Sequence, residues 1–363
     1  MKKTIFNELH KQFGAKMVEF AGFEMPIQYK NGIIHEHKVV REKVGVFDVS
    51  HMGEFDVQGL DSLAFIQKIT VNDASKLVPG KVQYSAMTRP DGCIVDDLLV
   101  YCLAKNHYML VVNGANVEKD YAWCKENIEG FDLLFTDISN EINLLAVQGP
   151  ESMDVLQELT DVDMSQVAFY TFTEGKLAGV DMIISRTGYT GELGYELYFR
   201  GDFETAKKIW DGVFAAGEKY GIEPVGLGCR DTLRLEKCYM IYGNDIDETT
   251  NPIEAGLGWI TKPTKGSFNG SDVIVKVKEE GPKRKLVGFF TEAERFIPRH
   301  RYKIYHDGKE VGYVTSGNMS PSLGRPIALG YVPTELAKPG TKIDIEARKK
   351  FFAAEIVKTP FLK

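Results

Sequence analysis

Long hydrophobic runs are absent from this 363-residue chain, and no apolar stretch approaches the roughly eighteen residues that a membrane-spanning helix needs. Positive charge is also in short supply, because 44 Lys and Arg residues face 51 Asp and Glu residues, a net charge of -7. Nucleic-acid-binding proteins neutralise phosphates with a basic surface, so this balance argues against them. The first residues include two lysines but no apolar signal core. The sequence therefore predicts a cytoplasmic protein that binds neither membrane nor nucleic acid.

Cysteine is scarce as well: the chain has five, an odd number, and none lies in a C-x-x-C pair. Neither a disulfide framework nor a zinc site follows from this spacing. His35 and His37 are close in sequence, but no third metal ligand is indicated nearby, and a solvated strand or loop pair is the preferred interpretation. No P-loop and no G-x-G-x-x-G motif is present, so nucleotide binding has no support. No metal site is expected.

The apolar share of 44% and charged share of 26% are typical of globular proteins, and the length predicts two or three domains. Apolar periodicity predicts a helix after residues 149–150 and another over about 203–217, while residues 95–103 and 108–112 read as a hairpin. Strands and crossover helices do not alternate regularly, which disfavours a doubly wound sheet. After residue 281, short strands separated by turns predict a small β domain. The fold class expected is α+β with mostly antiparallel sheets.

The most informative segment is residues 186–196, RTGYTGELGYE. Its glycines, Gly188, Gly191 and Gly194, favour a tight turn that brings the backbone close to a ligand. In the strand that follows, Glu196 shares a face with Tyr198, because side chains alternate. A buried carboxylate needs donors, and a pterin ring offers two adjacent N–H groups. The alternative is an ordinary glycine-rich hairpin with a solvated Glu196.

A second segment, residues 91–101, reads DGCIVDDLLVY: a turn followed by an apolar strand that contains two acids. Asp96 and Asp97 face opposite ways, and Asp97 shares its face with Tyr101. Asp is depleted in strands and is rarely buried unless paired. One of the two is therefore expected to be functional, the alternative being a hydrogen-bonded structural aspartate.

A third segment, residues 226–237, reads GLGCRDTLRLEK and predicts a helix with Arg230 and Arg234 at i and i+4. Two arginines on one helical face favour an anionic or polar ligand rim. A surface salt-bridge ladder would look the same. His51 lies beside Met52 in another ligand-like segment, where a hydrogen-bonded structural histidine is the preferred interpretation.

Together these segments resemble the T-protein family of the glycine cleavage system. Members of this family are tetrahydrofolate-dependent aminomethyltransferases. The resemblance extends over essentially the whole chain. Further matching segments are residues 20–26 (FAGFEMP), 45–54 (GVFDVSHMGE), 145–150 (LAVQGP) and 315–324 (TSGNMSPSLG). The resemblance implies a folate-binding aminomethyltransferase fold of three domains. These are a discontinuous folate-binding domain at 1–50 and 141–275, a second α+β domain at 51–140, and a C-terminal β-barrel-like domain at 280–363.

The resemblance also implies roles for individual residues. Asp97 matches the catalytic aspartate and Glu196 the glutamate that grips the pterin. Arg230 would act either on the ligand or on the ionised Asp97, and the sequence leaves both open. The other positions expected to line the folate cavity are Tyr189, Tyr101, Met52, Tyr84, Asn113 and Trp259.

The implied reaction joins two partners, tetrahydrofolate as the acceptor substrate and the lipoylated H protein of the glycine cleavage system as the donor. An acidic H protein would need a basic surface near the entrance, for which Arg299, Arg301 and Lys303 form one candidate cluster and Arg348, Lys349 and Lys350 another. A solvated run of charges is the alternative for each. Two rival functions remain on the same scaffold: another folate-dependent demethylase, and a non-catalytic folate-binding relative.

Overall fold

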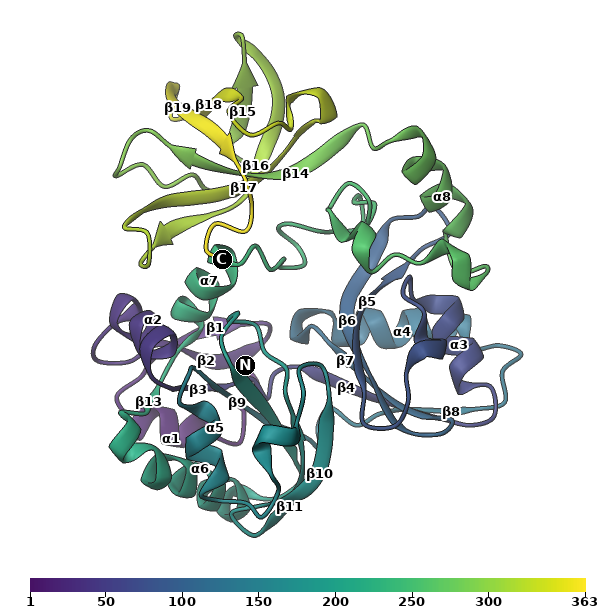
Figure 1. The fold of residues 1–363 in the computed structure, drawn as a ribbon, viewed down its shortest axis with the longest axis vertical. Helices are drawn as coiled ribbons and strands as arrows, with labels where there is room; N and C mark the ends of the chain where they lie inside the picture. The colour runs from purple at the N-terminus through teal and green to yellow at the C-terminus, as the bar shows by residue number, and fades with distance from the viewer. The chain divides into compact units, whose positions relative to one another are not determined.

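The computed structural model describes all 363 residues, which form two compact units. The first unit contains residues 1–66, 74–84 and 98–231, and the second contains 67–73, 85–97 and 232–363. Strand β6 (Ile94–Ala104) and helix α7 (Leu227–Glu236) each pass from one unit to the other, and both are labelled in Figure 1. None of the helices has the length and apolar character needed to cross a membrane.

The first unit contains a six-stranded sheet in the order β10-β11-β12-β9-β3-β13. All pairings are antiparallel except the short parallel pair of β13 with β3. At the centre of the sheet, Glu196 lies opposite Ala146 on one side and Ser185 on the other. The strands are β3 (Gly45–Asp48), β9 (Asn143–Gln148), β10 (Phe172–Leu177), β11 (Val180–Ser185), β12 (Gly194–Phe199) and β13 (Glu223–Pro224).

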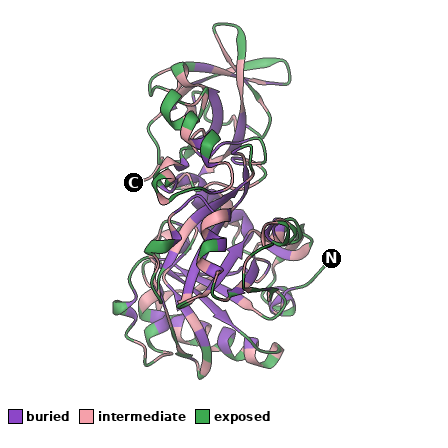
Figure 2. Cartoon of the chain, turned by 90° about the vertical axis from the view of Figure 1, so that its right-hand side faces the viewer, coloured by how far each residue is buried: buried purple, intermediate pink, exposed green.

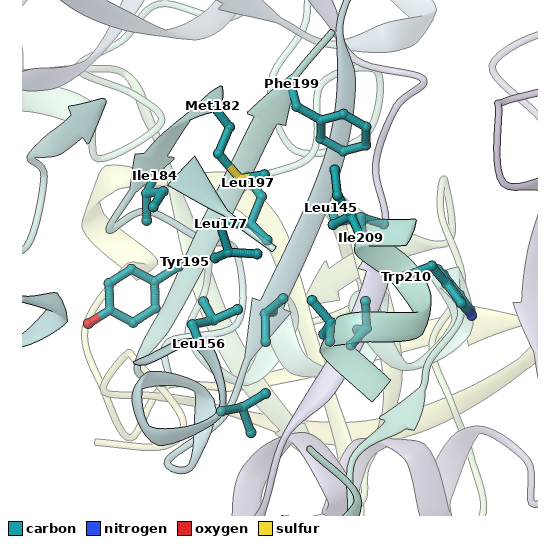
Figure 3. Packing of buried hydrophobic residues seen from close by; sticks show 14 of the residues in the cluster. Leu145, Leu156, Leu177, Met182, Ile184, Tyr195, Leu197, Phe199, Ile209 and Trp210 are labelled. Atoms are coloured by element: carbon teal, nitrogen blue, oxygen red, sulfur yellow. The ribbon is translucent and has the colours of Figure 1, made fainter. Parts of the chain in front are cut away.

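One face of this sheet is covered by helix α6 (Phe203–Gly217), whose buried residues recur every three or four positions. Asp202 caps the helix by accepting a hydrogen bond from the backbone N–H of Thr205 at 3.0 Å. Figure 3 shows Leu197 and Phe199 of β12 in the same core as Trp210 of α6. The helix predicted at 203–217 is confirmed. Two shorter helices also contribute to this core, α1 (Asn7–Gln12) and α5 (Ser152–Gln157).

A five-stranded sheet has the order β5-β6-β7-β4-β8, and its β6–β7, β7–β4 and β4–β8 pairs are antiparallel. Strands β6 and β7 form the predicted hairpin, which turns at Asn106 with φ of 60°. Its register places Leu99 opposite Val111, and Val111 opposite Glu54. The remaining bounds are β4 (Gly53–Gln58), β5 (Val82–Thr88), β7 (His107–Val112) and β8 (Leu134–Asp137), with helices α3 (Ser62–Ile69) and α4 (Val117–Asn127).

Helix α7 begins where Gly226 packs directly on the last residues of β2 (Phe23–Gln28). A Cβ atom at Gly226 would lie 2.5 Å from the carbonyl oxygen of Ile27, so only glycine permits this approach. The N–H of Gly226 donates to Oε2 of Glu36 at 2.9 Å, which fixes the start of the helix. β2 pairs with β1 (Lys16–Phe20), and Glu36 belongs to α2 (Ile33–Glu42).

The C-terminal part of the second unit is a closed barrel in the order β14-β17-β16-β15-β18-β19. Its inner face is lined by alternating apolar residues that include Phe289, Val314 and Ile345. The buried strands of the molecule are coloured purple in Figure 2. The strands are β14 (Arg284–Thr291), β15 (Lys303–His306), β16 (Lys309–Ser320), β17 (Arg325–Pro333), β18 (Lys342–Ala347) and β19 (Lys350–Val357), and helix α8 (Ser271–Glu280) precedes them.

Arg234, predicted to stand on a ligand rim or in a surface ladder, does neither. It is 2% exposed and donates to Oδ2 of Asp245 at 2.6 Å and to Ser316 at 2.8 Å. Thr315 donates to the other oxygen of Asp245 at 2.6 Å. Arg234 thus joins the end of α7 to a barrel strand. The sequence could not show this because Asp245 and Ser316 meet Arg234 only through the tertiary fold.

The α+β class, the mostly antiparallel sheets and the C-terminal barrel are confirmed. The three domain ranges stay a prediction, since the contacts divide the chain into two units whose boundary passes through β6 and α7. Short 3-10 helices complete the fold: η1 (Ala74–Lys76), η2 (Gly114–Asn116), η3 (Met164–Gln166), η4 (Glu218–Tyr220), η5 (Leu257–Trp259), η6 (Pro263–Lys265) and η7 (Thr334–Leu336).

Candidate active site

Glu196 lies on the face of β12 opposite the hydrophobic core and is 9% exposed. Its Oε2 atom accepts hydrogen bonds from the hydroxyls of Thr187 and, at 3.3 Å, Tyr198. Both bonds reach the same oxygen, so Oε1 is left for another donor. Burial raises the pKa of Glu196, while donation by Thr187 and the positive charge of Arg230 oppose the rise.

Tyr101 of β6 completes a network of hydroxyl groups beside Glu196. Its hydroxyl lies 3.0 Å from Ser185, 3.2 Å from Thr187 and 3.0 Å from Tyr198. Burial raises the pKa of Tyr101, so the phenol keeps its proton. The network therefore offers neutral donors to Glu196 and holds the carboxylate in one orientation.

Arg230 and Tyr189 form the second part of the site. The guanidinium carbon of Arg230 lies 4.5 Å from the centre of the Tyr189 ring, within the range of a cation–π contact. The charge of Arg230 favours the ionised form of Glu196 and lowers the pKa of His51. The first unit therefore brings four of the predicted site residues together: Glu196, Tyr101, Tyr189 and Arg230.

The glycine-rich segment differs from its prediction in one respect. A Cβ atom at Gly188 would lie 2.1 Å from Oε1 of Gln148, and one at Gly194 would lie 2.3 Å from its Nε2. These two glycines make room for Gln148, which donates to the carbonyl oxygen of Thr187 at 3.2 Å. The space predicted for a ligand at these positions is filled by an internal side chain, and the turn itself is at Gly191, with φ of 76°.

Two buried polar atoms at the start of β4 have no hydrogen-bond partners: Nδ1 of His51, just before the strand, and Oε2 of Glu54, within it. Burial lowers the pKa of His51 from 6.5 to about 4, helped by the nearby charge of Arg230. Its ring packs edge-on against Phe20, with 5.4 Å between ring centres. His51 was expected to be hydrogen-bonded, but its Nδ1 atom has no partner.

The other predicted residues divide between the units. Met52, Tyr84 and Asn113 belong to the first unit, and each is partly buried. Asp97 and Trp259 belong to the second unit, where Asp97 is partly buried and Trp259 is 64% exposed. Asp97 and Tyr101 are four residues apart in β6, so the strand presents them on one face, and the fully buried Asp96 is on the other. The catalytic role of Asp97 stays a prediction.

No cluster of three or more His, Cys, Asp or Glu side chains has a geometry suited to a metal ion. His35 is exposed and lies 2.8 Å from a carboxylate oxygen of Glu223, whereas His37 is fully buried in α2. The interpretation of this pair as a solvated strand or loop pair is wrong: both residues lie in helix α2, which turns the side chain of His37 to the buried side. All five cysteines are free thiols.

Two family models match the chain: the GCVT N-terminal domain over residues 6–265 and the glycine cleavage T-protein C-terminal barrel domain over residues 284–363. The chain belongs to the glycine cleavage T-protein family. An aminomethyltransferase from Bacteroides thetaiotaomicron is 54% identical, and one from Halothermothrix orenii is 50% identical; both alignments cover 100% of each chain. The crystal structure of the glycine cleavage system aminomethyltransferase T from Bartonella henselae superposes with a TM-score of 0.92 at 33% identity, over 99% of this chain and 98% of that one.

The predicted family and enzyme class are thereby confirmed. Several site residues were not singled out from the sequence: Thr187, Ser185, Gln148 and Glu54. Thr187 lies inside the glycine-rich segment, and Gln148 and Glu54 lie inside segments that carry the family resemblance. Membership of those segments was the available signal, but Thr, Ser and Gln are common residues whose partners only the fold reveals.

Proposed function

We propose that this aminomethyltransferase of the glycine cleavage system uses tetrahydrofolate and the lipoylated H protein as its two substrates, in the cytoplasm. The S-aminomethyl-dihydrolipoyl arm gives up its methylene, ammonia leaves, and 5,10-methylenetetrahydrofolate forms. Two C–N bonds to the folate form while one C–N and one C–S bond break. The two protons lost by the folate nitrogens leave on ammonia and on the dihydrolipoyl thiol, so the reaction involves no net oxidation.

The arrangement around Glu196 is the observation that carries this proposal. Its Oε2 atom is already held by two hydroxyl groups, and Oε1 has no donor from the protein. The adjacent ring N–H and amino group of a pterin match a carboxylate held in this way, because charge-assisted paired bonds are strong and directional. Arg230 supports the same function because its positive charge favours the ionised form of Glu196 and opposes the effect of burial on the pKa of that acid.

Asp97 is the residue we propose to act on the reacting nitrogen. A carboxylate there would stabilise the positive charge that develops as ammonia leaves, and would orient the nucleophilic nitrogen of the folate. The transfer also requires that water be excluded from the electrophilic methylene. The guanidinium of Arg230 stacks on the ring of Tyr189, and its charge favours the ionised form of Glu196, so we propose that Arg230 acts on the bound ligand or on its carboxyl partners.

Substitution of Glu196 tests the binding half of the proposal. Glu196→Gln removes the charge and cannot accept both pterin donors, so tetrahydrofolate binding is expected to weaken by ~1.5 to 3 kcal/mol. Calorimetric titration with tetrahydrofolate measures this, and the melting temperature checks the fold. Equal affinity of variant and wild type would remove Glu196 from the site.

Substitution of Asp97 tests the catalytic half. Asp97→Asn keeps the shape but loses the charge, so single-turnover methylene transfer is expected to fall by ~100-fold or more while folate still binds. Asp96→Asn, on the opposite face of β6, is the matched control and should affect transfer much less. If Asp97→Asn transferred the one-carbon unit at the wild-type rate with saturating folate, the chain would bind folate without using this acid.

A further inference from the structure

Glu54 is a buried acid that none of the roles above uses. It lies in β4 and is 1% exposed. Its register partner in β7 is Val111, which in turn lies opposite Leu99 in β6. Residues directly opposite in antiparallel strands point to the same face, so Glu54 shares a face with Leu99 and with Tyr101, two positions further along β6. This is the face from which Tyr101 reaches the Glu196 network.

The carboxyl group of Glu54 is not satisfied by the protein. Its Oε2 atom is buried and has no hydrogen-bond partner. The neighbouring hydroxyl of Ser139 bonds to the backbone of Glu54 and to Asp137, not to the Glu54 side chain. Leaving a buried polar atom unpaired costs about 1 to 3 kcal/mol, so a purely structural glutamate would be expected to have a partner here.

We propose that Glu54 is a further ligand-binding residue, whose carboxyl group contacts a polar atom of the same ligand that Glu196 holds. This inference rests on the proposed folate function and adds a second carboxyl group to the site. The ligand atom must complement a group that the protein has left unpaired. On a reduced pterin, the ring carbonyl oxygen and the one ring nitrogen that carries no hydrogen are acceptors of the required kind.

The protonation state of Glu54 decides which ligand atoms it selects. Burial raises its pKa well above 4.5, and the negative charges of Asp137 and Glu196 add to the rise. Tyr101 and Asp97 lie on the same face of the sheet as Glu54, and the charge of Glu54 contributes to the raised pKa of Tyr198. The raised pKa favours the protonated, donating form of Glu54, whereas Thr187, Arg230 and Tyr198 favour the carboxylate form of Glu196, which accepts. Glu54 and Glu196 together favour a ligand that has a donor edge next to an acceptor edge.

Calorimetric binding of tetrahydrofolate to three variants from about pH 6 to about pH 9 tests this inference. Glu54→Gln keeps a neutral donor, so at low pH its affinity should stay within roughly threefold of wild type. Glu54→Leu removes the donor and should bind about tenfold more weakly at the low end of the range. Wild-type affinity should fall as rising pH ionises Glu54, and the Glu54→Gln variant should lack this dependence.

The third variant, Glu196→Gln, separates the two possible failures. If Glu196→Gln binds tetrahydrofolate as the wild type does, the proposed folate function fails. If Glu196→Gln weakens binding while Glu54→Leu matches wild type throughout the pH range, the function stands and Glu54 is not a ligand-binding residue. Should Glu54→Leu fail to fold, the pH profiles of wild type and Glu54→Gln decide, since identical profiles overturn the inference.

Discussion

Single residues of the site show how burial sets protonation. Glu196 and Glu54 are both buried acids, yet donors and the charge of Arg230 oppose the rise in pKa only at Glu196. His51 is buried near the same arginine and is neutral, because both burial and that positive charge disfavour the imidazolium. The site therefore contains Glu196, whose carboxylate has hydrogen-bond donors, Glu54, whose Oε2 atom has none, and His51, a neutral base.

His51 makes the free energy of unfolding depend on pH, because its contribution to stability is lost in acid. Its folded-state pKa of about 4 is below the ordinary 6.5, so between these values the unfolded chain binds a proton that the folded chain does not. The stability is present above pH 6.5 and is lost as pH falls toward 4, and the shift corresponds to about 3 kcal/mol. We expect His51→Asn to lack this loss, as measured by urea unfolding at about pH 7 and about pH 4.5.

His300→Asn is the control for the urea unfolding of His51→Asn, because it also loses one titratable group. His300 is at an exposed position in the second unit. If the stability of wild type relative to His51→Asn did not decline on acidification, the imidazole would not be buried in its neutral form.

At the scale of elements, close backbone approach fixes where helix α7 starts. Gly226 leaves no space for a side chain because a Cβ there would meet the backbone of Ile27 at 2.5 Å and of Gln28 at 2.7 Å. Backbone cannot rotate away as a flexible side chain can. The start of α7, and with it the position of Arg230 one turn later, therefore depends on this glycine.

We expect Gly226→Ala to destabilise the protein by ~1 to 3 kcal/mol, the range for forced overpacking. Gly212→Ala is the matched control within α6, where the nearest atom would be Cβ of Ala178 at an ordinary 3.5 Å. There the higher helix propensity of alanine should stabilise by ~0.5 to 1 kcal/mol. Thermal unfolding of both variants measures the two effects, and a destabilising Gly212→Ala together with a neutral Gly226→Ala would contradict the packing argument.

At the scale of the whole molecule, the net charge of -7 does not prevent a local basic surface. Of the two candidate clusters, the one at Arg299, Arg301 and Lys303 is partly neutralised, because Lys303 lies 2.6 Å from Glu310. The other occupies the turn between β18 and β19, where Arg348 and Lys349 have φ of 51° and 64° and are exposed. This turn is the stronger candidate for contact with an acidic H protein.

We expect Arg348→Asn combined with Lys349→Gly to raise the apparent KM for H protein severalfold at low salt, on the order of the effects of interface rim charges on association. Asn-Gly suits a two-residue hairpin turn with positive φ, so the fold should be kept. The difference should shrink at high ionic strength, since salt screens exposed charges. Steady-state kinetics at two salt concentrations measure this, with Lys303→Gln as the control. A larger effect of Lys303→Gln would place docking elsewhere.

The sequence by itself determined the local elements and the family. Apolar periodicity predicted α6 at 203–217 and the β6–β7 hairpin, because helix and strand periods are properties of neighbouring residues. The motifs predicted the family and an aminomethyltransferase, which the comparisons confirmed. Alternation along β12 correctly placed Glu196 and Tyr198 opposite the core.

Only the tertiary structure decided what each polar side chain meets. Gln148 fills the space beside Gly188 and Gly194, Arg234 is paired with Asp245, and Oε2 of Glu54 is left without a partner. In each case the partner, or its absence, depends on segments that are distant in the chain. Hydrogen bonds and burial are set by distances of a few ångströms in space, and a linear pattern of residue types does not contain them.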